Sequence, residues 1–140
     1  MSTFETLFAA ASAAREKAHA PYSRFHVGAA LLDENGVVHA GCNIENAAYP
    51  EGWCAETTAI GHMIMGGGRA IRMAVVVAPR IDFERTPGGQ FCTPCGGCRQ
   101  RLAEFAAADV PVYACDPEGR NALFLMQDLL PAGFSLETDR

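Results

Sequence analysis

The chain lacks several features that mark whole classes of protein. Its longest apolar runs, such as AVVVA, have the length of a strand and are too short to cross a bilayer. Its first residues lack the basic start of a secretory signal. Basic residues are not in excess, since the formal net charge is -5, and long nucleic acids usually require a basic stripe. We therefore expect a cytoplasmic protein that binds neither a membrane nor a nucleic acid polymer.

Internal repeats, low-complexity tracts and linkers are also missing. The 140 residues are 49% hydrophobic and 19% charged, which is typical of one globular domain over residues 1–140. The chain does contain six cysteines. In a reducing compartment, and with a core of adequate size, cysteines are expected as thiols or metal ligands and not as disulfides.

Periodicity and turn residues predict an α/β chain. The predicted elements are a helix over 3–19, a hairpin with strands over 25–31 and 37–42, a helix over 53–65, a strand over 72–79, a loop over 80–93, a helix over 94–108, a strand over 110–116, and a last strand with a short helical turn over 121–131. Strands that alternate with helices favour a three-layer α/β/α sandwich around a mixed five-stranded sheet.

The motif PCGGC indicates a metal site. Cys95 and Cys98 are three residues apart at a helix start, where side chains are neighbours, and zinc–sulfur bonds of about 2.3 Å let one ion bridge both. A CxxC pair also serves redox chemistry, but Cys54 offers a third ligand from another helix start. Helix N-termini stabilise thiolates. Three cysteines leave one coordination position for water, as catalytic zinc sites do.

Glu56 lies two residues after Cys54 in the stretch CAE. We expect it to stand beside the ion without ligating it, and to move a proton there. One alternative is a closed structural zinc site with Cys92 as the fourth ligand, which would leave Glu56 without a purpose. Cys42 and Cys115 fall in strand-like apolar runs and are expected to be buried hydrophobes.

Five motifs occur together along most of the chain: PYSRFHVGAALL, GCNIENAAY, CAE, PCGGCRQ and the terminal LLPAGF. In this order the chain resembles the cytidine deaminase family in its small three-cysteine form. The resemblance implies hydrolytic deamination of cytidine and deoxycytidine, a step of pyrimidine salvage. It also implies one Zn²⁺ per subunit on Cys54, Cys95 and Cys98, with Glu56 as proton shuttle.

The same resemblance implies how a nucleoside is held. Asn43 and Glu45 would hydrogen-bond the ribose hydroxyls, Phe25 would pack against the pyrimidine, and the backbone of Ala55 would contact its edge. The residues agree with this, because positions i and i+2 of an extended segment face one side. A carboxylate that accepts from two hydroxyls suits a sugar diol, and a phenyl ring gives a base a flat apolar face.

Family members of this form are typically homotetramers in which neighbouring subunits complete each site. The resemblance implies that Phe134 and Tyr49 reach across in this way, although the chain has PAGF where PGAF is more usual. A second departure is Thr57, which stands where many members have arginine. Three thiolates and Zn²⁺ leave one net negative charge, so we expect Arg99, the helix N-termini and the Thr57 hydroxyl to offset it, with Arg99 contributing most.

Two other functions remain open at this point. A structural zinc module could bind a protein or nucleic acid partner, although the acidic charge of the chain favours an enzyme. A deaminase could instead act on a modified cytidine, an aminonucleoside antibiotic or a polynucleotide cytosine. The pair Asn43 and Glu45 favours a ribose-bearing monomer.

Overall fold

The computed structural model describes residues 1–83 and 86–136. Its elements, in chain order, are α1 (Thr3–Arg15), β1 (Gly28–Asp33), β2 (Val38–Cys42), the 3-10 helix η1 (Tyr49–Glu51), α2 (Ala55–Met65), β3 (Ile71–Val77), β4 (Ile81–Phe83), β5 (Thr86–Gln90), α3 (Gly96–Phe105), β6 (Pro111–Cys115), β7 (Asn121–Leu125) and α4 (Met126–Leu129). Within the described ranges, none of the helices is long and apolar enough to pass through a membrane.

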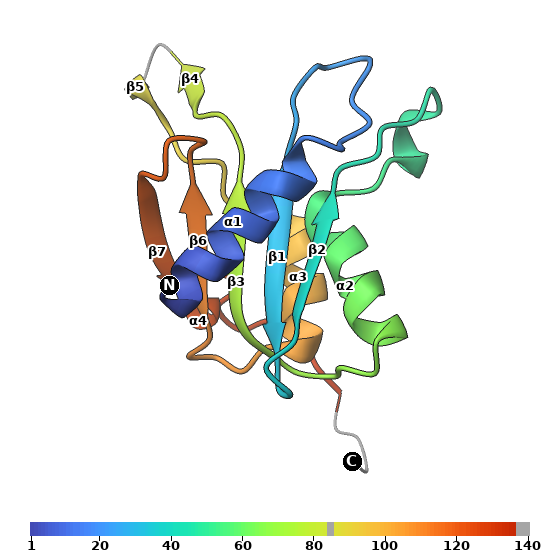
Figure 1. Ribbon diagram of the computed structural model, residues 1–140, viewed down its shortest axis with the longest axis vertical. Helices are drawn as coiled ribbons and strands as arrows, with labels where there is room; N and C mark the ends of the chain where they lie inside the picture. Colours follow the sequence, from blue (N-terminus) through green and yellow to red (C-terminus); the bar gives the residue numbers. More distant parts are fainter. Residues whose placement is uncertain (84–85, 137–140) are drawn as a thin grey trace.

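Five of the strands form one mixed sheet in the order β2-β1-β3-β6-β7. Strand β1 is antiparallel to β2 and β3, β3 and β6 are parallel, and β7 returns antiparallel to β6. Helix α1 lies across one face of the sheet, and α2 and α3 cover the other face (Figure 1). The predicted α/β/α sandwich with a mixed five-stranded sheet is confirmed.

The core has two parts because successive strand residues point to opposite faces of the sheet. Leu31 and Val76 belong to the cluster beneath α2 and α3, whereas Ala30 and Val75 pack with α1. All four side chains are fully or almost fully buried. The central strands are therefore covered on both faces, which explains their unbroken apolar runs.

Two glycines allow helices to approach the sheet closely. A Cβ atom on Gly28 would lie 1.9 Å from the carbonyl oxygen of Ala11, so α1 packs directly on the backbone of β1. A Cβ atom on Gly41 would lie 2.4 Å from the backbone nitrogen of Ala59 in α2. The second contact fixes the position of α2 against the edge strand β2, and the residues at the start of α2 are fixed with it.

The hairpin begins later than predicted. Strand β1 starts at Gly28, and the expected strand residues from Phe25 to Val27 lie outside the sheet. The side chain of Asn43 replaces the strand pairing there, since its Nδ2 donates to the Phe25 carbonyl at 2.8 Å and its Oδ1 accepts from the Val27 N–H at 2.9 Å. Arg24, with φ of 59°, turns the chain just before this segment.

Other predicted boundaries also shift. The predicted loop over 80–93 contains the β4–β5 ribbon, whose pattern is hidden by proline and glycine; residues 84 and 85 of that loop lie outside the described part of the chain. The first helix ends at Arg15, not at residue 19. The third helix spans 96–105 instead of 94–108, because Cys95 is its extended N-cap and Ala106 leaves helical geometry to pair with Ile71.

A buried hydrogen bond between Asp33 and His39 stabilises the turn that joins β1 to β2. Asp33 is 1% exposed, and its Oδ2 lies 2.8 Å from Nε2 of His39. Its Oδ1 accepts from the backbone N–H groups of Asn35 at 2.8 Å and Val37 at 3.0 Å. Burial alone would raise the pKa of Asp33, but the bonds from His39 and from these two N–H groups outweigh it and hold the pKa below the ordinary value of 3.8.

We expect Asp33→Ala to lower the free energy of unfolding by about 3 kcal/mol, because it leaves the buried His39 ring and two N–H groups without an acceptor. The wild-type carboxylate stabilises the folded chain fully above pH 3.8. This stabilisation is lost as the pH falls through the lower pKa that Asp33 has in the folded chain. Urea unfolding at several pH values measures both effects. A loss no larger than that of the exposed control Asp109→Ala would contradict this role.

Candidate functional site

Two helices that are far apart in sequence begin close together, each with a cysteine as its N-cap residue. Cys54 precedes α2 and Cys95 precedes α3, and neither side chain hydrogen-bonds to its own helix. Their sulfur atoms lie 3.9 Å apart. The buried Cys98, one turn into α3, completes a group in which all three Sγ atoms lie within 4.8 Å of one another. CAE and PCGGC therefore meet in space.

This group fits a zinc ion. Sulfurs at the corners of a tetrahedron, each about 2.3 Å from zinc, are about 3.8 Å apart, close to the separation of Cys54 and Cys95. Among residues 1–83 and 86–136, no fourth histidine, cysteine or carboxylate joins the group. The described residues therefore do not form the closed site with Cys92, and three ligands leave one coordination position open.

The three thiols interact strongly with one another. Hydrogen bonding with Cys98 lowers the pKa of Cys54 to about 6 against the effect of burial, and Cys95 and the charge of Arg101 act in the same direction. The same contact with Cys54, together with burial, raises the pKa of Cys98. One of the three thiols is thus readily ionised, and a bound cation is required before the others lose their protons as well.

Glu56 is a buried carboxyl group next to this sulfur group. It lies in the first turn of α2 and is 4% exposed. Burial raises its pKa to about 7, and the negative charge of Cys54 adds to the effect. Its side chain is outside the sulfur group but borders the same cavity as Cys54 and Cys95. The site therefore combines a metal-binding group with a carboxyl that exchanges protons near neutral pH.

The cavity has a volume of about 650 Å³, which is sufficient for a small molecule. It is bordered by Tyr22, Ser23, Val27, Asn43, Ile44, Glu45, Asn46, Tyr49, Gly52, Trp53, Cys54, Ala55, Glu56, Val76, Cys92, Thr93 and Cys95. The rings of Tyr22 and Tyr49 meet edge-on with centroids 6.3 Å apart, and both side chains are more than half exposed. These two rings mark the side of the cavity that faces solvent.

Glu45 borders the cavity as a charged, partly buried carboxylate. It accepts hydrogen bonds from the backbone N–H groups of Tyr22 at 3.0 Å and Ser23 at 3.1 Å, and from the hydroxyl of Ser23. The bond from the Ser23 hydroxyl is the main reason that the pKa of Glu45 lies below its ordinary value, against a smaller effect of burial. Ser23 was not found from the sequence, because a serine in a loop carries no pattern that singles it out.

Ile44 connects the segment of Asn43 and Glu45 with the segment that leads to Cys54. Its N–H donates to the Trp53 carbonyl at 2.9 Å, and the Trp53 N–H donates back at 2.8 Å. The N–H of Glu45 donates to the carbonyl of His19 at 2.7 Å. Three segments of the chain are therefore joined side by side along one wall of the cavity.

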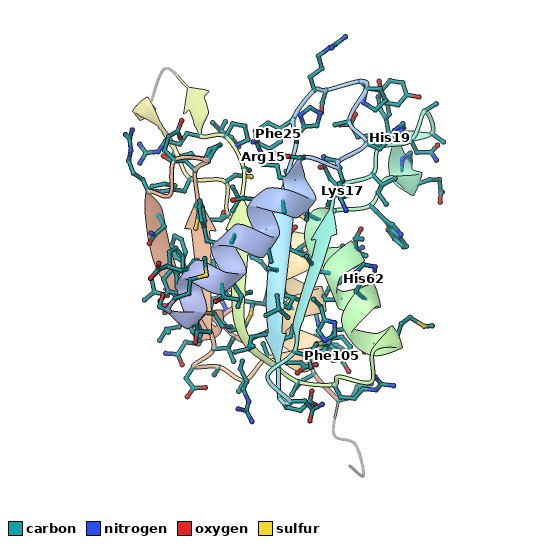
Figure 2. The ribbon with its side chains drawn as sticks, in the orientation of Figure 1. Arg15, Lys17, His19, Phe25, His62 and Phe105 are labelled. Atoms are coloured by element: carbon teal, nitrogen blue, oxygen red, sulfur yellow. The ribbon has the colours of Figure 1, made fainter. Side chains whose placement is uncertain are left out.

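The remaining substrate-binding predictions divide into two groups. Tyr49 and Ala55 border the cavity. Phe25, on the segment between α1 and β1 (Figure 2), is not among the bordering residues, and Val27 takes the place beside the cavity. Phe134 also lies elsewhere: its side chain is 73% exposed, and its carbonyl accepts a bond from Gln100 at 3.2 Å.

Arg99, which the sequence predicts to offset the charge of the thiolates, directs its hydrogen bonds to other groups. Its Nε donates to the Pro94 carbonyl at 2.7 Å, its Nη1 to the Leu129 carbonyl at 3.0 Å and its Nη2 to Thr93 Oγ1 at 3.0 Å. These bonds hold the loop before α3 against α4. The helix turn explains the difference, because the residue directly after Cys98 points about 100° away from it around the helix.

Two other side chains contact the buried sulfur of Cys98. The hydroxyl of Thr57 lies 4.0 Å from it, which places this residue where it could act on the charge of the sulfur. Nη1 of Arg101 lies 3.9 Å from the same sulfur. Sequence reasoning missed Arg101, although its position three residues after Cys98 places it on the same face of α3 and was a usable signal.

The other three cysteines are separate thiols. Cys115 is buried as predicted, and burial raises its pKa to about 12, with a further contribution from Asp116. Cys42 is half-buried. Cys92 borders the cavity and is half-buried, and burial raises its pKa as well.

Comparisons with known proteins agree with this geometry. The family model described as the cytidine and deoxycytidylate deaminase zinc-binding region matches residues 1–114. A cytidine deaminase of Sporosarcina psychrophila is 44% identical over 133 residues, which is 95% of this chain and 92% of that protein. The crystal structure of a cytidine deaminase from Burkholderia pseudomallei has a TM-score of 0.83 and 39% identity, and the match covers 96% of this chain and 100% of that one.

A second solved structure, a cytidine deaminase from Mycobacterium tuberculosis, matches with a TM-score of 0.77 and 33% identity over 97% of this chain and 100% of that one. Family model, relatives and structures thus agree over nearly the whole sequence. The sulfur group and Cys54–Glu56 lie inside the matched region. On this evidence the chain belongs to the cytidine and deoxycytidylate deaminase family.

Proposed function

We propose that this protein is a zinc-dependent cytidine deaminase, which hydrolyses cytidine and deoxycytidine to uridine and deoxyuridine and releases ammonia. The observation that carries the proposal is the convergence of three cysteine sulfurs and one buried carboxyl group at a single cavity. A structural zinc module would need neither the open coordination position nor a carboxyl group with a raised pKa.

Cys54, Cys95 and Cys98 would hold the ion. Bound zinc supplies a water molecule whose pKa is lowered enough for attack near neutral pH. Cys54 and Cys95 border the cavity, whereas Cys98 lies behind them in the core. A ligand in the cavity therefore reaches the site from the side of Cys54 and Cys95.

Glu56 would carry the protons of the reaction. Hydrolysis joins an oxygen to C4 of cytosine and breaks the bond from C4 to the amino group. Glu56 takes a proton from the attacking water and delivers it to N3. It then takes the proton of the hydroxyl group now on C4 and passes it to the amino group, which leaves as ammonia while the C4 oxygen becomes a carbonyl. A pKa of about 7 suits both the uptake and the release of a proton.

Asn43 and Glu45 would bind the sugar. The lowered pKa of Glu45, caused mainly by the bond from the Ser23 hydroxyl, keeps its carboxylate ionised and able to accept from hydroxyl groups. Asn43 uses one hydrogen and one lone pair to hold the segment of Phe25 and Val27, which leaves its amide a second donor and a second acceptor. Val27 and Ala55 offer apolar contacts to the base.

The protein would act as a cytoplasmic homotetramer in pyrimidine salvage, with Phe134 and Tyr49 completing neighbouring sites. Both side chains are more than 70% exposed in the single chain, although both are large and apolar. The net charge of -5 gives no support to a nucleic acid polymer as partner, so the proposed partner is a small nucleoside.

Glu56→Gln should retain one zinc per chain and lose at least about 1,000-fold in kcat, because the amide keeps the shape of the side chain but cannot carry protons. The decrease in ultraviolet absorbance of cytidine follows the reaction, and metal analysis follows the zinc. Glu118→Gln, an exposed carboxylate outside the cavity, is the matched control. A wild-type protein that binds zinc without deaminating any nucleoside in a substrate panel would instead favour a structural module.

Ser23→Ala should raise KM for cytidine about tenfold with little change in kcat, because Glu45 loses the hydroxyl that holds it toward the cavity. Steady-state kinetics with cytidine and with an analogue lacking both ribose hydroxyls distinguishes an effect on sugar binding from an effect on the fold of the loop. The effect should vanish for the analogue. An equal rise in KM for both compounds would show that Ser23 acts on the fold of the loop and not on sugar binding.

Phe134→Ala should lower kcat/KM about tenfold without lowering stability, since the side chain is exposed in the single chain but would be buried against a neighbour. Leu136→Ala is the control, because Leu136 is 75% exposed on the same tail. Activity assays with sedimentation analysis give both readouts. A fully active monomer, or equal effects of the two substitutions, would contradict the shared site.

A further inference from the structure

We propose that Arg101 balances the negative charge of the three cysteine ligands through its contact with Cys98, and so sets the zinc affinity of the site. This inference rests on the proposed zinc-dependent function. Arg101 does not touch the cavity, so its role is to position and stabilise a ligand.

The charge balance creates the need for such a residue. Three thiolates and one Zn²⁺ leave one negative charge, and the carboxyl group of Glu56 stands beside them. Cys98 is 0% exposed, so water does not stabilise the charge on its sulfur. A buried thiolate therefore requires hydrogen-bond donors or a cation from the protein.

Arg101 meets this need by geometry. Its Nη1 lies 3.9 Å from the Cys98 sulfur, within the range of a hydrogen bond to sulfur, and the two residues are one turn apart on α3. Gly97 leaves the space that the guanidinium occupies, since a Cβ atom there would lie 3.1 Å from Nη1. Arg101 is an exposed residue, so its charge does not have to be removed from water to make this contact.

The two other candidates from the sequence do not supply this charge. All three nitrogens of the Arg99 guanidinium donate to the Pro94 and Leu129 carbonyls and to the Thr93 hydroxyl. Thr57 contacts the Cys98 sulfur at 4.0 Å but is neutral. Arg101 is thus the cation that the described hydrogen bonds place at a ligand sulfur.

The test compares Arg101→Gln, which removes the charge, with Arg101→Lys, which keeps it. Zinc affinity is measured by competition with a chromophoric chelator, starting from metal-free protein, with Arg72→Gln as an exposed control on β3. We expect Arg101→Gln to weaken zinc binding about tenfold, as loss of a residue that supports a metal ligand does, and Arg101→Lys to restore most of it. Added salt should narrow the difference between wild type and Arg101→Gln, because the guanidinium is exposed.

Equal zinc affinity of wild type and Arg101→Gln would overturn the inference. Equal losses of zinc affinity in Arg101→Gln and Arg101→Lys would also overturn it, because they would indicate a packing role. Urea unfolding of the metal-free variants checks that each is folded. The readout does not depend on turnover. If the affinities follow the expected order while no variant deaminates a nucleoside, the proposed function fails and the role of Arg101 stands.

Discussion

The site depends on the close packing of α2 against the edge of the sheet. Gly41 has no side chain, so the backbone of α2 near Ala59 lies directly on β2. This contact fixes where α2 begins, and its N-cap is Cys54. Helix α3 follows strand β3 after the β4–β5 ribbon and begins at the same end of the sheet as α2 (Figure 1). Three sulfurs can share one ion because two helix starts are held at one point.

The same cavity gives two carboxyl groups opposite properties. Glu56 is buried and accepts few hydrogen bonds, so desolvation raises its pKa to about 7. Glu45 is only partly buried and accepts bonds from Ser23 and Tyr22, led by the Ser23 hydroxyl, and its pKa falls. One carboxyl can therefore exchange protons near neutral pH while the other stays charged and, under the proposed function, accepts from the hydroxyl groups of the sugar. Their surroundings assign these tasks, since the two side chains are chemically identical.

Much of the fold and of the sulfur group could be predicted from the sequence, because the patterns that indicate them are local. The PCGGC spacing and its helix start predict two neighbouring sulfurs, and alternation with helical periodicity predicts the layered α/β fold. The sequence is less informative about which way a side chain points, because this depends on the residue at which a helix or strand begins. Residue propensities do not define that starting point. Arg99 and Arg101 are two positions apart on α3 and therefore point in different directions. Arg99 hydrogen-bonds to the loop before the helix, whereas Arg101 contacts the sulfur of Cys98. The late start of β1 likewise depends on Asn43, which is distant in sequence.

The paired bonds between Ile44 and Trp53 have a consequence for selectivity. Ile44 stands between Asn43 and Glu45, and Trp53 directly precedes Cys54, so two backbone bonds join the segment of Asn43 and Glu45 to the segment that leads to the sulfurs. The wall of the cavity thus holds these two segments at a fixed separation. Under the proposed function, this wall sets the distance between the groups that bind the sugar hydroxyls and the group that acts on the reacting carbon, so a base without a sugar makes contacts at one end of the wall and none at the other.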